Sequence, residues 1–237
     1  MKKAITLSAA TLALLVAGAS GASAVSAASA VSAKDSTGTI GFIANTSTQP
    51  DITNPEVQGV TGQGGGTTGE LAIDYVSSLN FGQHQISSKK ETYFANNDTT
   101  AFKGKAVAAF VEMHDLRGLG SGGKNGTQLT VTQEKQFKND SGAELKAAIL
   151  SFSAGTAANA GGGTPQTSTN KFELTPGQAQ TVMSTDGTVG QFLTSYGKAS
   201  DYTGNETGGP ISLSVPSGSA LAGTFTAKLV WNLAVAP

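Results

Sequence analysis

Apolar and polar residues alternate along short segments of this chain, and clusters of turn residues separate the segments. The pattern predicts β-strands, because successive strand side chains point to opposite faces. The predicted strands are 70–76, 91–95, 105–115, 127–137, 145–154, 170–175, 179–184, 211–216 and 224–235. No convincing amphipathic helix lies between them, and parallel strands need long crossovers, so we expect antiparallel sheets. The predicted fold class is all-β, an antiparallel β-sandwich-like domain over residues 70–237 with long glycine-rich loops.

The last predicted strand has the strictest alternation and holds the only tryptophan of the chain, Trp231. Its apolar face carries Phe225, Ala227, Leu229, Trp231, Leu233 and Val235. Aromatic residues on an apolar strand face usually pack inward, so Trp231 is interpreted as a core anchor. A surface that stacks on sugars or binds a partner is the alternative interpretation of the same face.

Residues 1–33 are predicted to be a secretory signal peptide. Lys2 and Lys3 precede an uncharged apolar run, and small residues follow. This order is typical of a signal peptide, and the run is too short and too rich in Ala and Ser to predict a membrane span. We expect cleavage after Ala30 or Ala33, with Ala24 as the earlier alternative. No second apolar stretch is long enough to cross a bilayer, so the chain is predicted to be secreted and without a membrane span.

Residues 34–69 are predicted to form a flexible N-terminal segment. Two prolines and the run Gly64–Gly66 are typical of a linker, and only "TIGFIA", residues 39–44, could form an edge strand. The boundary with the β domain is therefore placed at residue 70.

The composition of the chain bears on its stability and on whether it binds nucleic acid. The chain has no cysteine, so a secreted form must rely on its core for stability. Removal of the signal peptide would take two of the 15 basic residues and none of the 16 acidic ones, leaving a net charge of −3. A mildly acidic domain argues against nucleic acid as a partner.

The residue types of the loop "GLGSGGKN" match two phosphate-binding patterns, but the predicted structure around the loop does not. Gly118, Gly120 and Gly123 fit G-x-G-x-x-G, and Gly118 to Lys124 fits G-x-x-x-x-G-K. A phosphate loop needs a hydroxyl residue next and a following helix, whereas Asn125 and a predicted strand come next. The segment is therefore interpreted as a loop between strands.

The sequence offers no catalytic or metal constellation. His84 and His114 are the only histidines, and Asp115 is adjacent to His114, so the two side chains should face opposite ways on a strand. Two distant histidines do not make a metal site. We expect no enzymatic activity, no metal and no cofactor. A glycosidase site built from paired carboxylates has no specific support in the sequence.

Arg117 is the only arginine, at the junction of a predicted strand and the glycine loop. It shares a face with Asp115 at a spacing of two, which favours an ion pair that braces the loop. Binding of an anionic ligand is the alternative.

Four blocks, in order, resemble the WxL cell-surface domain family of Gram-positive bacteria over about residues 37–237. They are "ELAIDYVSSLNFG" with Phe81 and Gly82, "VEMHDLRGLGSG" with Asp115, Arg117 and Gly118, "LKAAILSF" (145–152), and Trp231-Asn232-Leu233 followed by Ala236-Pro237. The combination in order is specific, although each motif alone is weak.

One position departs from the family pattern. Members usually carry a proximal W-x-L after the D-x-R-G loop, and here Thr127-Gln128-Leu129 stands in that place. If the missing tryptophan contacts ligand, that contact is lost in this chain. If it only packs, Thr127 leaves a volume that another residue must fill.

The resemblance implies a secreted, non-catalytic cell-surface protein that attaches non-covalently to the Gram-positive cell wall, with peptidoglycan as the ligand. It also implies assembly with a membrane-anchored WxL-interacting protein and with other WxL proteins. The alternative function is a structural subunit or adhesin-like component that binds mainly this partner protein. Trp231, Leu233, Thr127 and Leu129 are the WxL positions expected to pack or to bind the wall.

Overall fold

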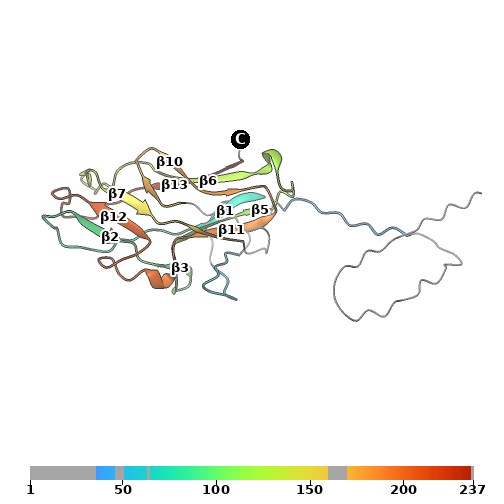
Figure 1. Ribbon diagram of the computed structural model, residues 1–237, viewed down its shortest axis with the longest axis horizontal. Helices are drawn as coiled ribbons and strands as arrows, with labels where there is room; N and C mark the ends of the chain where they lie inside the picture. Colours follow the sequence, from blue (N-terminus) through green and yellow to red (C-terminus); the bar gives the residue numbers. More distant parts are fainter. Residues whose placement is uncertain (1–35, 46–50, 63–64, 160–169, 236–237) are drawn as a thin grey trace, which may run out of the picture. The chain divides into compact units, whose positions relative to one another are not determined.

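The computed structural model describes residues 36–45, 51–62, 65–159 and 170–235, and strands dominate it (Figure 1). The predicted signal peptide, residues 1–33, and the closing Ala236-Pro237 lie outside the described residues. Within the described part, no helix is long and apolar enough to cross a membrane. Its two short 3₁₀ turns are η1 (Gly123–Asn125) and η2 (Ala199–Asp201).

The described residues form thirteen strands in chain order. These are β1 (Leu71–Val76), β2 (Glu91–Phe94), β3 (Asp98–Phe102), β4 (Lys105–Val107), β5 (Phe110–Asp115), β6 (Thr127–Gln133), β7 (Ile149–Phe152), β8 (Thr156–Asn159), β9 (Phe172–Leu174), β10 (Ala179–Thr185), β11 (Gly190–Ser195), β12 (Ile211–Val215) and β13 (Leu229–Val235). Each of the nine predicted strand segments contains at least one observed strand.

The strands pair only in the antiparallel sense among the described residues, which confirms the predicted fold class. Two four-stranded sheets have the orders β1-β5-β11-β8 and β2-β12-β7-β9. A three-stranded sheet has the order β10-β6-β13, and β3 pairs with β4. The pairing partners are mostly distant in sequence, so the architecture is sandwich-like rather than a series of hairpins.

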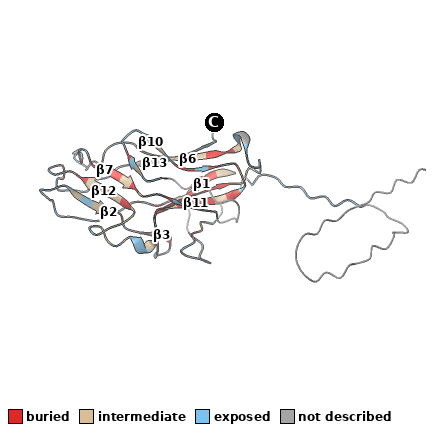
Figure 2. Cartoon of the chain, viewed as in Figure 1, coloured by how far each residue is buried: buried red, intermediate tan, exposed pale blue. Residues whose placement is uncertain are grey.

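The main hydrophobic core joins the three larger sheets. It includes Val111 and Phe192 from the β1-β5-β11-β8 sheet, Leu129 from β6, and Leu150 and Ile211 from the third sheet. Figure 2 shows buried positions gathered on these strands. A core shared by facing sheets stabilises a cysteine-free domain of this size through apolar burial.

A second, smaller core covers the other face of the β1-β5-β11-β8 sheet. Phe110 and Leu193 from that sheet pack with Phe102 from β3 and with Ile52, which is only 1% exposed. The segment 51–62 is therefore part of the folded domain, and the prediction of a flexible segment over 34–69 is wrong for these residues. The prediction failed because Ile52 packs against the outer face of a sheet, and this contact leaves no periodic pattern in the segment 51–62.

The edge strand considered for Thr39–Ala44 is also absent, because residues 36–45 have no regular secondary structure. Two further differences concern strands. The predicted strand 105–115 is broken at Ala108-Ala109 into β4 and β5, and β3, β8 and β11 were not predicted. β11 is buried on both faces, with Phe192 in the main core and Leu193 in the smaller one. A strand covered on both faces loses the alternation that reveals strands in a sequence.

Candidate functional site: a groove beside Trp231

The two WxL positions lie on adjacent strands that run in opposite directions. In the β6-β13 pair, Leu233 faces Leu129, Trp231 faces Val131, and Val235 faces Thr127. The two leucines are thus direct cross-strand neighbours, while Trp231 and Thr127 lie at opposite ends of the motif pair. Thr127 therefore does not mark a missing ring beside Trp231.

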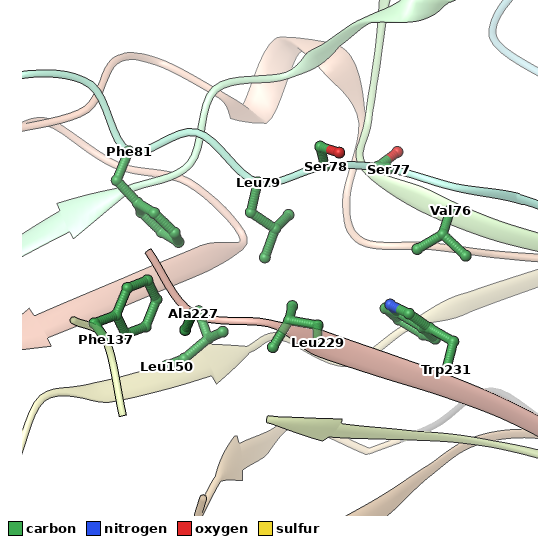
Figure 3. Close-up of a pocket in the computed structure, with 10 residues that line it drawn as sticks. All are labelled: Val76, Ser77, Ser78, Leu79, Phe81, Phe137, Leu150, Ala227, Leu229 and Trp231. Atoms are coloured by element: carbon green, nitrogen blue, oxygen red, sulfur yellow. The ribbon is translucent and has the colours of Figure 1, made fainter. Parts of the chain in front are cut away.

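A surface groove of about 440 Å³ opens beside Trp231. One wall is β13 and the residues before it, and the other is the extended chain that follows β1. The lining residues are Val76, Ser77, Ser78, Leu79, Phe81, Phe137, Leu150, Ala227, Leu229 and Trp231. Figure 3 shows Val76, Leu79 and Phe81 pointing across the groove toward Trp231, Leu229 and Ala227.

Trp231 packs against the main core, as its interpretation as a core anchor predicts, but it is only partly buried. The alternation on β13 is as predicted, and its inward side chains do pack against the main core. However, β13 borders its sheet, and Trp231 lines the groove and remains partly exposed. Trp231 is both a packing residue and an accessible aromatic surface.

Phe81 and Gly82 position the opposite wall of the groove. His84 stacks on Tyr93 with ring centroids 3.8 Å apart and donates from Nε2 to the Phe81 carbonyl oxygen at 2.6 Å. Gly82 has a φ of +81°, and a Cβ there would lie 2.7 Å from Asn205 Oδ1. The structure thus requires glycine next to Phe81, which explains the Phe-Gly pair physically.

Asp115 and Arg117 form the predicted ion pair at the base of the glycine loop. Arg117 Nε donates to Asp115 Oδ1 at 2.9 Å, and Nη2 donates to Oδ2 at 2.6 Å. Nη2 also donates to the Asn125 carbonyl oxygen at 2.6 Å. These bonds tie the loop start to its end, and the hydrogen bond to Asp115 helps to raise the pKa of Arg117. Gly118 follows with a φ of +70°, where the chain turns into the loop.

At the position where the WxL pattern has tryptophan, Thr127 forms a buried polar pair with another threonine. It is 1% exposed, and its Oγ1 lies 2.6 Å from Thr185 Oγ1 in a hydrogen bond across the β6-β10 pair. The two hydroxyl groups satisfy each other, so the position needs no large side chain to be packed. The structure does not bring Thr127, Asp115 or Arg117 into the groove beside Trp231.

His114 is a buried histidine that is held at both ring nitrogens. His114 is fully buried, with Nδ1 2.6 Å from Asp74 Oδ1 and Nε2 2.7 Å from the Gly69 carbonyl oxygen. An oxygen partner at each ring nitrogen favours the protonated form of the ring. Burial acts to lower the pKa of His114, but these hydrogen bonds raise it overall. As predicted, His114 does not pair with Asp115, since adjacent strand residues face opposite ways.

Glu112 is a second buried ionisable residue on the same face of β5 as His114. Thr53 donates to its carboxyl group from the backbone N–H at 3.1 Å and from Oγ1 at 2.9 Å. Burial raises the pKa of Glu112 to about 8, against the lowering effect of these bonds. Glu112 thus anchors the segment 51–62 to the sheet. No group of three or more His, Cys, Asp or Glu side chains within the described ranges could hold a metal ion.

Sequence reasoning identified Trp231 and Phe81 but missed most of the groove. Val76 and Leu79 lie in the block that ends with Phe81-Gly82, and Leu150 lies in the block 145–152, but no role was predicted for them. They line the groove only because distant segments of the chain meet there.

Comparison with known families gives one result that spans the folded chain. The model of the family described as "WxL domain surface cell wall-binding" matches residues 29–237. No curated protein and no solved structure matches the chain significantly.

Proposed function

Because the chain belongs to the WxL domain surface cell wall-binding family, we propose that it attaches non-covalently to the Gram-positive cell wall by binding peptidoglycan. The observation that carries the proposal is the accessible indole of Trp231 in an open groove opposite Phe81. Aromatic rings combine a large apolar surface with specific contact geometry, which suits the apolar faces of sugar rings.

The groove offers polar contacts as well as rings. Ser78 is exposed on its rim, and Ser77 and Ser78 both contribute to its lining. A few polar groups beside an apolar floor are typical of ligand sites that fix orientation. The wall ligand would lie along β13, with rings of the glycan against Trp231 and with the hydroxyl of Ser78 at the edge.

Co-sedimentation with walls tests the ligand. We expect the secreted protein to pellet with intact walls and equally with peptidoglycan stripped of proteins and accessory polymers. If it pellets with intact walls and stays in the supernatant with stripped peptidoglycan, another wall component is the ligand. If it pellets with neither, the proposal of wall attachment fails.

We also propose a second candidate, binding of a membrane-anchored WxL-interacting protein. The aliphatic part of the groove, Val76, Leu79, Leu150 and Leu229, favours an apolar protein side chain over a sugar. In that case, retention on walls would require the partner, and walls treated with protease would no longer retain the chain.

The proposed role is binding without catalysis. His114 is enclosed between Asp74 and Gly69, and His84 is engaged by Phe81 and by Glu206, whose Oε1 lies 3.0 Å from Nδ1. We expect no soluble fragments to appear when stripped peptidoglycan is incubated with the protein. Release of reducing ends or of free peptides above the buffer control would contradict the proposed role.

A further inference from the structure

The outer edge of β13 carries backbone hydrogen-bonding groups that face away from its neighbour. Among the described residues, β13 pairs with β6 alone. Lys228 O accepts a hydrogen bond from Glu134 N at 2.9 Å, so the backbone of Lys228 points toward the chain of β6. Because this direction alternates along an antiparallel strand, the N–H and C=O groups of Leu229, Trp231 and Leu233 point outward. Such an edge can accept another strand.

The side chains next to this edge are also incompletely covered. Leu229, Trp231 and Leu233 face the main core, yet each remains partly exposed. The groove opens between them and the wall that carries Leu79 and Phe81. A strand added at the edge would therefore gain both backbone hydrogen bonds and an apolar surface for its inward side chains.

The chain itself contains a segment with the matching properties. Residues 39–44, "TIGFIA", have no regular secondary structure, and their large side chains are exposed to 76% at Ile40, 86% at Phe42 and 96% at Ile43. Three such residues within four positions are unusual for a soluble surface. In an extended strand Ile40 and Phe42 would share one face, and Ile43 would lie on the other.

We propose that residues 39–44 of one copy of this protein add as a strand to the outer edge of β13 in a second copy. Ile40 and Phe42 would enter the mouth of the groove beside Trp231, and Ile43 would lie on the outer face of the enlarged sheet with Asn232.

A second copy is the occupant that the fold favours. Ile52 anchors the chain on the outer face of the β1-β5-β11-β8 sheet, with Phe110 and Leu193. β13 instead borders a sheet on the far side of the main core, where Leu129 and Val131 of β6 lie beside it in the same sheet. A strand from another copy can reach the edge of β13 without crossing from one side of the main core to the other in its own copy.

This arrangement would link copies head to tail. Each copy would donate its own segment and accept one, and accepting a strand closes the groove. Only the copy at one end of a row would keep an open groove, and on the proposed function this copy would contact the wall.

The absence of native cysteine allows a clean disulfide test on the secreted protein. Chains with Ile43→Cys are mixed with chains that carry one cysteine on the outward face of β13, at Val230, Asn232 or Ala234, and are oxidised mildly. We expect a covalent dimer of the two different chains with at least one of the three, and several-fold less with Ser141→Cys, an exposed loop control. Equal linking to the control would overturn the proposal.

A chain with both cysteines distinguishes the two geometries. Donation between copies predicts a ladder of covalent oligomers from the Ile43→Cys, Asn232→Cys double variant. A product that is only an internally linked monomer would overturn the proposal in favour of closure within one copy.

Mass measurement tests assembly without cysteine. By sedimentation equilibrium, we expect the average mass of the secreted protein to rise with concentration, and to remain that of a monomer for Phe42→Asp. Thr37→Asp, an exposed control two residues before this segment, should assemble normally. A wild-type protein that is monomeric at every concentration would contradict the proposal. Wall binding is read separately: a monomeric Phe42→Asp chain that still pellets with walls supports the proposed function, whatever the outcome for assembly.

Discussion

At the scale of single residues, two buried ionisable side chains have a direct effect on stability. Glu112 and His114 lie two positions apart on β5, on the face opposite the main core, and neither is exposed. They hold Thr53 and Gly69, near the two ends of the chain segment that precedes β1. Their protonation states are therefore linked to the attachment of this segment.

The pH dependence of stability follows from the raised pKa of Glu112. The folded protein keeps the Glu112 proton up to a pKa of about 8, whereas the unfolded chain releases it near the ordinary pKa of 4.5. Between these values the folded state holds more protons, so the free energy of unfolding falls as pH rises, by several kcal/mol at most. The raised pKa of His114 acts in the same direction, because its stabilisation is lost as the ring loses its proton.

We therefore expect urea denaturation to show higher stability at pH 5.5 than at pH 8.5. Glu112→Gln keeps the acceptor for Thr53 and removes the titration, so its stability should depend less on pH. A variant with the same slope as the wild type, or a wild-type protein that becomes more stable with rising pH, would show that Glu112 is not protonated in the folded state.

Arg117→Ala is expected to destabilise the fold, because it leaves the buried Asp115 carboxylate without its two-point partner. Breaking such a pair costs about 3–5 kcal/mol when it is fully buried, and about 2–3 is expected here because Arg117 is partly exposed. Arg117→Lys should recover only part, since an ammonium group cannot reproduce the fork. Thermal unfolding measures both variants, and full recovery by Lys would argue against the bidentate geometry.

Thr127→Trp tests whether the departure from the WxL pattern is a defect or an adapted site. Thr127 is buried and its hydroxyl is bonded to Thr185, so an indole there would overpack the core and leave the Thr185 hydroxyl without its partner. We expect a loss of about 2–4 kcal/mol in unfolding free energy. A stabilised Thr127→Trp variant would mean that the site retains space for the ring.

At the scale of elements, β13 shows what an alternating pattern can and cannot predict. The strand and its inward face were predictable, because the large apolar residues Leu229, Trp231 and Leu233 recur at a spacing of two. Its position at the sheet border was not, because pairing with β6 joins segments about a hundred residues apart. Whether Trp231 is covered depends on that position, so the sequence left its exposure open.

The segment 51–62 is the element where sequence reasoning failed most clearly. Its prolines and glycines are typical of a linker, yet Ile52 is buried against Phe110 and Leu193, and Thr53 is bonded to Glu112. We expect Ile52→Ala to cost about 2–4 kcal/mol in urea denaturation, as for other buried large-to-small changes. Val57→Ala, in the same segment but only partly buried, should cost less than half as much. Equal and negligible effects would restore the linker interpretation.

At the scale of the whole molecule, the fold class and most strands were predictable from turn residues and alternation. The strands missed, β3, β8 and β11, are short or, in the case of β11, covered on both faces. The Asp115–Arg117 pair was predictable because it is local. The groove was not predictable. Its two walls are the chain after β1 and β13, which are about 150 residues apart in the sequence.

The central claim is that the accessible indole of Trp231 contacts the wall ligand, and the affinity for stripped peptidoglycan measures this directly. Trp231→Ala should weaken binding at least about tenfold, as expected for an aromatic anchor, while Trp231→Phe should retain part of the affinity. Asn232→Ala, its exposed neighbour on the opposite face, should bind like the wild type. All three variants must first be shown to be folded at the assay temperature. The account predicts that loss for a folded Trp231→Ala chain, and wild-type affinity in that chain would contradict it.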